Sequence, residues 1–403
     1  MIPTTKSSQA GLALALAFFS GMLSSSLPTP LYPVYVSLYR FSASQIMAVF
    51  GVYAAGVLLA LLFTAKVNVR PEAYTRPVYT GLGCVLISSL LMMFADNITL
   101  LLIARLITGL GSGILMAYIN RSLIKIFATE VSNHAALIAS AALILGQAIG
   151  PFITGNIVQH NFYSLKAPFI ILLVLVLLSL FAIWRCRERV NKPIQPVAEP
   201  QQNLTLHRHR PLTLRDVYLC CMAIFLSWAM ASTLMSQGPT LAHNGYAIGS
   251  VQLVSYCLSL FLLTAGITQW LMRKRHHYSS LKIGVSTQLA AILLALVSVQ
   301  LISPALVLVA VIAEGFAYGA ILVGAATIVN QVARQKQRTH LINLLYITGY
   351  VGNWLPFALS IMMDHYPLLK ALSDYLIVCS LLAFCIALAA QVSARKLYQS
   401  PMV

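Results

Sequence analysis

Twelve apolar segments follow one another along the chain, and they constrain its fold more than any other feature. A helix needs about 20 apolar residues to cross about 30 Å of hydrocarbon. Hydrophobic residues make up 59% of the 403 residues and charged residues only 9%, whereas a soluble domain is roughly a quarter charged. The sequence therefore predicts an all-α integral membrane protein of twelve transmembrane helices. The expected spans are residues 10–36, 44–64, 77–95, 98–120, 134–157, 167–185, 214–236, 250–271, 281–301, 304–330, 339–363 and 370–391.

The basic residues indicate how these spans are oriented. With a cytoplasmic N-terminus, 22 of the 26 Lys and Arg residues fall on the cytoplasmic side, three (Arg40, Lys166 and Lys370) fall outside, and Arg105 lies inside a span. This bias follows the positive-inside rule and predicts that both termini are cytoplasmic. The net charge of +17 is then explained by topology and by contact with anionic lipid headgroups, so no nucleic-acid partner is expected.

One polar connection divides the spans into two groups of six. Residues 186–213 are charged and rich in proline, a composition typical of a linker. We expect an N-terminal six-helix bundle at residues 1–185, a cytoplasmic linker at 186–213 and a C-terminal six-helix bundle at 214–403. Gly109 and Gly113 in span four are echoed by Gly315 and Gly319 in span ten. Such spacing often serves helix packing alone, but its recurrence six spans later indicates an internal repeat.

Three short motifs carry a family resemblance. RLITGLGSG places Arg105, Gly109 and Gly113 in an R-x-x-x-G-x-x-x-G pattern, GQAIGPFITG follows in span five, and SSSLPTPLYPVY lies in span one. With the twelve spans and the basic linker, the chain resembles the major facilitator superfamily of secondary transporters. The resemblance implies the major facilitator fold and alternating access. GQAIGPFITG resembles a signature of proton-coupled antiporters. SSSLPTPLYPVY resembles the first span of bacterial drug exporters, which implies that the protein lies in the inner membrane.

One loop departs from that family pattern. Between spans two and three the family usually has G-x-L-x-D-R-x-G-R-R, whereas this chain reads AKVNVRPEAYTR. Val69 falls where the family has an aspartate that helps to lock the cytoplasmic gate. The gate of this chain is therefore expected to be held differently.

Glu314 is the only one of nine acidic residues that lies deep in a span. A rise of 1.5 Å per residue from Pro304 places it about 15 Å into the bilayer. An ionised carboxylate costs at least about 2.5–3.5 kcal/mol there, so it should face a water-filled cavity or be protonated. We expect Glu314 to be a proton-coupling site; a neutral Glu bonded to a neighbouring helix is the structural alternative. Glu314, Gly315, Tyr318 and Gly319 are expected to share one helical face.

Arg105 carries a permanent charge into span four. It must pair with backbone carbonyls, cavity water or an anion. We expect Arg105 to be the proton-coupling counterpart of Glu314; a contact for an anionic substrate and a structural residue are the alternatives. Gly146, Gly150, Pro151 and Gly155 recur on one face of span five, where Pro151 should kink the helix and the glycines should admit a close neighbour. With Gly109 and Gly113 they form the expected conformational motif, and tight packing alone is the alternative.

Polar and aromatic residues in three spans suggest a cavity for an organic molecule. Span eleven contains four polar residues, Asn343, Tyr346, Tyr350 and Asn353. Their spacing of three, four and three residues predicts that they lie in one stripe along the helix. Aromatic anchoring at the membrane interface is the alternative for such rings. The expected cavity residues are Tyr318, Asn343, Tyr346, Tyr350, Asn353 and Trp228.

These features together predict a carrier and not an enzyme. GLGSG differs from the turn of intramembrane serine proteases, since Leu110 stands where they have Gly, and no later span supplies a central His for Ser112. No metal spacing appears, and no cofactor is expected. The predicted function is proton-coupled export of a small organic compound, a drug-like molecule or a secreted metabolite such as a siderophore, by a monomer. Proton-coupled uptake and a non-transporting sensor are the alternatives.

Overall fold

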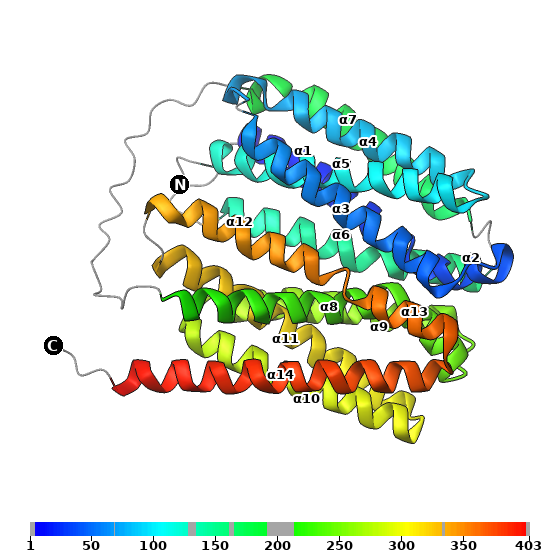
Figure 1. Cartoon of the computed structure of the whole chain (residues 1–403). Coiled ribbons are helices and arrows are strands. Elements are labelled where there is room, and N and C mark those ends of the chain that lie inside the picture. The colour runs from blue at the N-terminus through cyan, green and yellow to red at the C-terminus, as the bar shows by residue number, and fades with distance from the viewer. Residues whose placement is uncertain are drawn as a thin grey trace. The chain divides into compact units, whose positions relative to one another are not determined.

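The regular structure of the chain is helical in every part that the computed structural model describes, residues 5–67, 69–127, 134–160, 165–191, 213–332 and 335–399 (Figure 1). Within these residues, 12 helical stretches of 19 to 32 residues are long and apolar enough to cross a membrane. The predicted number of spans is therefore confirmed. Residues 192–212, which include most of the predicted linker, lie outside the described residues.

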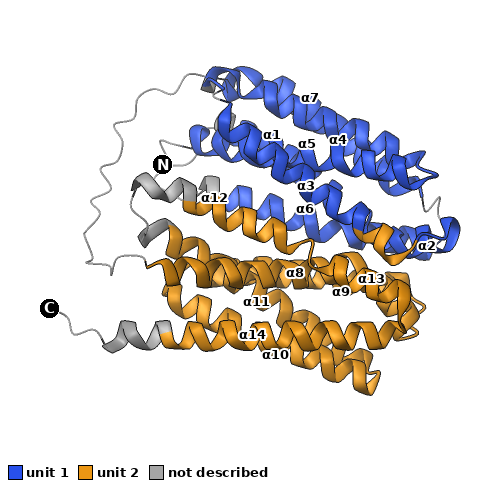
Figure 2. Ribbon diagram, viewed as in Figure 1, with its two compact units in different colours: residues 1–41, 48–205 blue, residues 42–47, 206–403 orange. Residues whose placement is uncertain are grey.

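The helices gather into two compact units, each with its own packing (Figure 2). Unit 1 comprises residues 1–41 and 48–205. Helix α7 runs to Val190, past the expected bundle end at residue 185, because the charged residues that follow the apolar run continue its last turns. The helices of unit 1 are α1 (Thr5–Ser26), η1 (Thr29–Leu31), α2 (Tyr32–Tyr39), most of α3 (Ala43–Lys66), η2 (Pro71–Ala73), α4 (Thr75–Met93), α5 (Ile98–Ile126), α6 (His134–Gln159) and α7 (Ala167–Val190).

Unit 2 comprises residues 206–403 together with the short segment 42–47. That segment, the start of α3, is held by Asp364, whose carboxylate accepts hydrogen bonds from the backbone N–H groups of Ala43 and Ser44 at 2.8 and 3.2 Å. Buried apolar side chains of α8, α10, α11 and α14 form its core. The helices of unit 2 are α8 (Leu214–Gly245), α9 (Val251–Met272), α10 (His277–Leu301), α11 (Pro304–Val332), α12 (Gln335–Gly352), α13 (Pro356–His365) and α14 (Leu368–Gln399).

The predicted span eleven is not one continuous helix. Helix α12 ends at Gly352 and α13 begins at Pro356, with a turn at residues 353–355 between them. Proline has no N–H to continue the ladder, and it is tolerated in the first turn of a new helix. Asn353 therefore lies in the turn, and the expected helical stripe of four polar residues ends at Tyr350.

The two glycine pairs make equivalent contacts in the two units. In unit 1, a Cβ added to Gly109 would collide with the backbone oxygen of Tyr53 on α3, and one added to Gly113 would lie 2.9 Å from the oxygen of Val57. In unit 2, a Cβ on Gly315 would lie 2.6 Å from the oxygen of Phe261 on α9, and one on Gly319 would collide with that of Ala265. Backbone approach this close requires glycine. The internal repeat read from the sequence thus corresponds to a repeated helix crossing.

Helix α6 continues through Pro151 and packs closely on α1. Pro151 cannot donate to the carbonyl of Gln147, and the hydroxyl of Ser26 donates to that carbonyl instead, at 2.7 Å. A Cβ on Gly146 would lie 2.7 Å from the oxygen of Phe19, and one on Gly150 would collide with the Ser26 hydroxyl. The expected close neighbour of this glycine face is therefore the end of α1.

Candidate functional site

Glu314 lies on α11 inside unit 2, and its side chain is 6% exposed. Its Oε2 accepts a hydrogen bond from Nε2 of Gln288 on α10 at 2.5 Å. Its Oε1 is buried and has no hydrogen-bond partner among the described residues, and the same is true of Oε1 of Gln288. The carboxyl group is thus held from one side and left with one unused oxygen.

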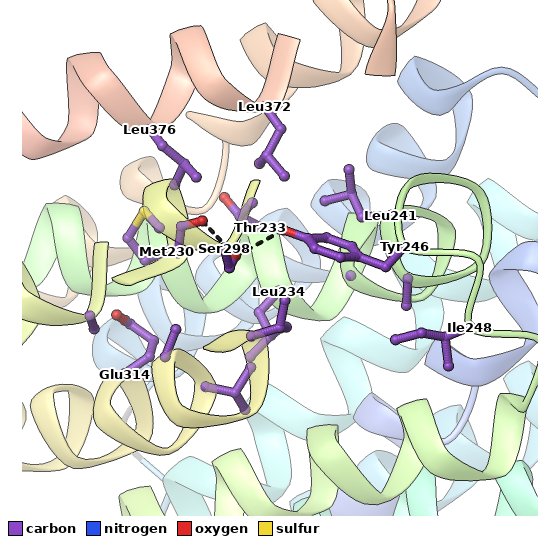
Figure 3. A pocket seen from close by; sticks show the side chains of 17 residues that line it. Met230, Thr233, Leu234, Leu241, Tyr246, Ile248, Ser298, Glu314, Leu372 and Leu376 are labelled. Carbon is purple, nitrogen blue, oxygen red and sulfur yellow. Dashed lines mark hydrogen bonds between the residues drawn. The ribbon is translucent and has the colours of Figure 1, made fainter. Parts of the chain in front are cut away.

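The carboxyl group of Glu314 lines a pocket within unit 2 (Figure 3). The pocket has a volume of about 130 Å³ and is bounded by residues of α8, α10, α11 and α14, nearly all of them apolar. A cavity of about 150 Å³ with apolar walls binds a molecule the size of benzene, so this pocket can hold a small organic group or a few water molecules. Its lining includes Met230, Leu234, Leu241, Ile248, Leu372 and Leu376.

Two hydroxyl pairs supply most of the remaining polarity around this pocket. The hydroxyls of Tyr246 and Ser298 are 2.9 Å apart, and both residues line the pocket (Figure 3). The hydroxyl of Thr233 lies 3.0 Å from that of Tyr375. Burial raises the pKa of Tyr246, and the hydrogen bond with Ser298 acts in the opposite direction. The hydroxyls of each pair are hydrogen-bonded to each other, whereas Oε1 of Glu314 is an acceptor without a partner among the described residues.

The helical face expected around Glu314 is divided between two neighbours. Gly315 and Gly319 face the backbone of α9, and the ring of Tyr318 packs edge-on against that of Phe261, also on α9, at 5.9 Å between centroids. Glu314 bonds to α10 instead. Glu314 and the two glycines are therefore adjacent on α11, but the glycines contact α9 and the carboxyl group contacts α10.

Three of the six expected cavity residues come together. The ring of Trp228 on α8 meets the ring of Tyr350 at 4.9 Å and that of Tyr346 at 6.3 Å, both in edge-on geometry. Nε1 of Trp228 is buried without a hydrogen-bond partner among the described residues. Asn343 is exposed and Asn353 lies in the turn after α12. The structure thus forms an aromatic cluster from Trp228, Tyr346 and Tyr350.

Arg105 lies on α5 in unit 1 and its side chain has no exposed surface. Its Nη1 donates to the backbone oxygen of Ser25 at 3.2 Å, and the guanidinium carbon lies 4.6 Å from the centre of the Tyr53 ring. Arg105 and Glu314 belong to different units, so no single unit contains both charges.

Gln288 is a functional candidate that the sequence analysis missed. The signal was available, because an amide side chain stands within the largely apolar helix α10, and a buried amide in a span needs a polar partner. Among the described residues, no group of three or more His, Cys, Asp or Glu side chains is placed to hold a metal ion. The polar chemistry of the site thus rests on a carboxyl, an amide and hydroxyls.

Residues 14–355 match the sequence model of the Major Facilitator Superfamily. The chain belongs to this superfamily. Comparison with proteins of curated function gave no match. The fold is that of transporters in the superfamily, and enzymes are not typical of it.

Solved structures of superfamily transporters share this fold. A bacterial homologue of the human lysosomal transporter Spinster is 14% identical over 97% of both chains, with a TM-score of 0.70. The nucleoside transporter NupG is 13% identical over 95% of this chain and 99% of its own, with a TM-score of 0.69. A peptide transporter POT in complex with sulfate is 14% identical over 96% of this chain and 94% of its own, with a TM-score of 0.75. The names of the last two give different cargoes, nucleosides and peptides, so the shared fold does not name a cargo for this chain.

Proposed function

We propose that this superfamily member is a proton-coupled antiporter that exports a small organic compound by alternating access. The observation that carries the proposal is Glu314, which is buried in unit 2, lines a pocket and has no hydrogen-bond partner for Oε1 among the described residues. A carboxyl group in a span exists either neutral or compensated. It can therefore take up a proton in one state of the carrier and release it in another, which is what proton coupling requires.

Export is supported by the motif GQAIGPFITG in α6, which resembles the antiporter signature. Its glycines admit the end of α1, and Ser26 replaces the hydrogen bond that Pro151 removes. A contact made of backbone, small residues and one hydroxyl can shift without breaking large side-chain interactions. We assign Gly109, Gly113, Gly146, Gly150, Pro151 and Gly155 to the conformational machinery.

The cargo surface is proposed to include the aromatic cluster of Trp228, Tyr346 and Tyr350. Edge-on rings and an unpartnered indole N–H suit an organic molecule with an acceptor atom. Tyr318, Asn343 and Asn353 remain candidates for the same surface. The carrier is proposed to work as a monomer in a bacterial inner membrane, with both termini in the cytoplasm, because the loop charges follow the positive-inside rule.

The cargo is found by comparing metabolites in cells that lack the protein with those in cells that overproduce it, since an exporter depletes its cargo from the cell. That compound is then tested in proteoliposomes with an imposed pH gradient. Glu314→Gln should bind the compound and catalyse its exchange across the membrane but lose gradient-driven accumulation. The matched control is Asp374→Asn, an exposed carboxylate of α14, which should behave as the wild type.

The alternatives give different results in the same experiments. Uptake predicts that the compound is enriched, not depleted, in overproducing cells. A sensor predicts ligand binding without flux in either direction. Full gradient-driven accumulation by Glu314→Gln would refute the assignment of the proton site.

A further inference from the structure

The charge of Arg105 is buried in unit 1, and no carboxylate among the described residues forms a hydrogen bond with it. Its side chain has no exposed surface, and Nη1 donates a hydrogen bond to the backbone oxygen of Ser25. Nε and Nη2 have no hydrogen-bond partner among the described residues. The face of the Tyr53 ring lies 4.6 Å from the guanidinium carbon and offers partial compensation. A buried permanent charge with free donors is costly unless an acceptor completes it.

Arg105 lacks hydrogen-bond acceptors, and the neighbouring side chains bring further donors that also need acceptors. The hydroxyls of Tyr32 and Tyr35 on α2 are buried and have no hydrogen-bond partner in the part of the chain that the structure describes. Both rings lie close enough to Arg105 to interact electrostatically with its charge. A tyrosine hydroxyl can accept a hydrogen bond from the guanidinium, but its own proton then still needs an acceptor. The cluster of Arg105, Tyr32 and Tyr35 therefore has more donors than acceptors, however the hydroxyls rotate.

The carboxylates of unit 1 that the structure describes do not supply the missing acceptor. Glu72 is exposed and lies in η2, Glu188 lies near the end of α7, and Asp96 accepts from the side chain of Asn97 at 2.6 Å. No hydrogen bond joins Nε or Nη2 of Arg105 to any of them within the described part of the chain. Glu130 and Glu199 lie outside the described residues.

We propose that the cluster of Arg105, Tyr32 and Tyr35 is a binding site for a monovalent anion with one or two acceptor atoms, a carboxylate group or a halide. Nε and Nη2 form one edge of the guanidinium, and two parallel N–H groups on an edge match the two oxygens of a carboxylate. The tyrosine hydroxyls then donate to the same anion. The proposal concerns unit 1 and does not depend on the proton role of Glu314.

The test uses the full chain in detergent and the sodium salts of benzoate and chloride. Thermal unfolding is followed at constant ionic strength while sodium sulfate is replaced by either salt. Binding to the folded state should raise the unfolding temperature with a saturable dependence on the anion. Arg105→Gln should lose this dependence, because the loss of charge-assisted hydrogen bonds weakens binding by at least about tenfold. Arg121→Gln is the matched control, since Arg121 is on the same helix and lies 5.2 Å from the Tyr118 ring but is exposed.

Two further variants separate anion binding from a structural role. Arg105→Lys keeps the charge but loses the two parallel N–H groups of the guanidinium, so it should weaken the binding of benzoate more than the binding of chloride. Tyr32→Phe combined with Tyr35→Phe should weaken both anions while Arg105 remains. A structural arginine would change the unfolding temperature without changing the ratio of the two affinities.

The source of the anion is decided by flux of radiolabelled benzoate in proteoliposomes. Benzoate flux that requires Arg105 supports a carboxylate on the cargo, whereas chloride binding without benzoate flux supports a resident halide. The proposal is overturned if neither anion raises the unfolding temperature of the wild type, or if the anions raise that of Arg105→Gln by as much as that of the wild type. Loss of proton coupling in Glu314→Gln with anion binding intact leaves this site standing, so failure of one proposal is distinguishable from failure of the other.

Discussion

Nε2 of Gln288 donates a hydrogen bond to Oε2 of Glu314 at 2.5 Å, which joins α10 to α11 inside unit 2. An amide can serve either state of a carboxyl group. Its N–H donates to an ionised carboxylate, and after rotation its carbonyl accepts from the O–H of a neutral acid. Because Oε1 of Glu314 and Oε1 of Gln288 have no partner among the described residues, this exchange breaks no other hydrogen bond.

The first prediction concerns that pair. Gln288→Leu leaves the carboxyl group without a polar partner, which should destabilise the protein by about 1–3 kcal/mol. The same substitution in a Glu314→Leu background should cost much less, because the group that needed the partner is gone. A double-mutant cycle on the free energy of unfolding in detergent measures the difference. Thr287→Val, whose hydroxyl bonds only within α10, is the control, and strict additivity of the pair would contradict the prediction.

The second prediction concerns the pocket beside Glu314. Ala310 lines the pocket one turn before Glu314 and is 5% exposed. Ala310→Leu should fill part of the volume, keep the thermal stability within about 1 kcal/mol or raise it, and slow proton-driven transport by blocking access to the carboxyl group. Transport of the identified cargo in proteoliposomes is the measurement. Ala305→Leu, at an exposed position of the same helix, should have no effect; equal rates in both variants would exclude the pocket as a route.

The third prediction concerns the glycine contacts between helices. Gly319→Ala should destabilise unit 2 by about 1–3 kcal/mol, because the added Cβ collides with the backbone oxygen of Ala265. Gly83→Ala on α4 meets no atom within 4 Å and should be neutral or stabilising by up to about 1 kcal/mol. Thermal unfolding of the two variants makes the comparison. Equal effects would show that the close approach of α11 to α9 carries no energetic constraint.

The fourth prediction concerns the proline of α6. Ser26→Ala removes the donor to the Gln147 carbonyl and should cost about 1 kcal/mol or more, since that carbonyl then has no partner in its place. In a Pro151→Ala background the helix recovers its own N–H, so Ser26→Ala should cost less. Unfolding free energies of the four proteins in this cycle test the coupling. A cost of Ser26→Ala that is the same in both backgrounds would mean that Ser26 does not substitute for the missing backbone bond.

Much of the fold is predictable because spanning helices obey local rules. The length of each apolar run decides whether it can cross the hydrocarbon, and each span satisfies its own backbone. The twelve spans follow from the sequence in this way, whereas the superfamily was indicated by the resemblance of its motifs and is confirmed by the family match. The break at Pro356 was missed because the apolar run continues across it. The bundle boundaries and the orientation of the termini stay predictions.

The pattern of apolar and charged residues along the chain was enough to predict twelve membrane-crossing helices and one deeply placed acidic residue, Glu314. The side chains that surround Glu314 could not be predicted, because they come from other helices that pack against α11. Gln288 is 26 positions from Glu314, and Trp228 meets Tyr350 from another helix. Such contacts between side chains of different helices depend on how each helix is rotated about its axis and at what angle it crosses its neighbours. That geometry is set by the packing of many side chains together, which no spacing along one helix encodes.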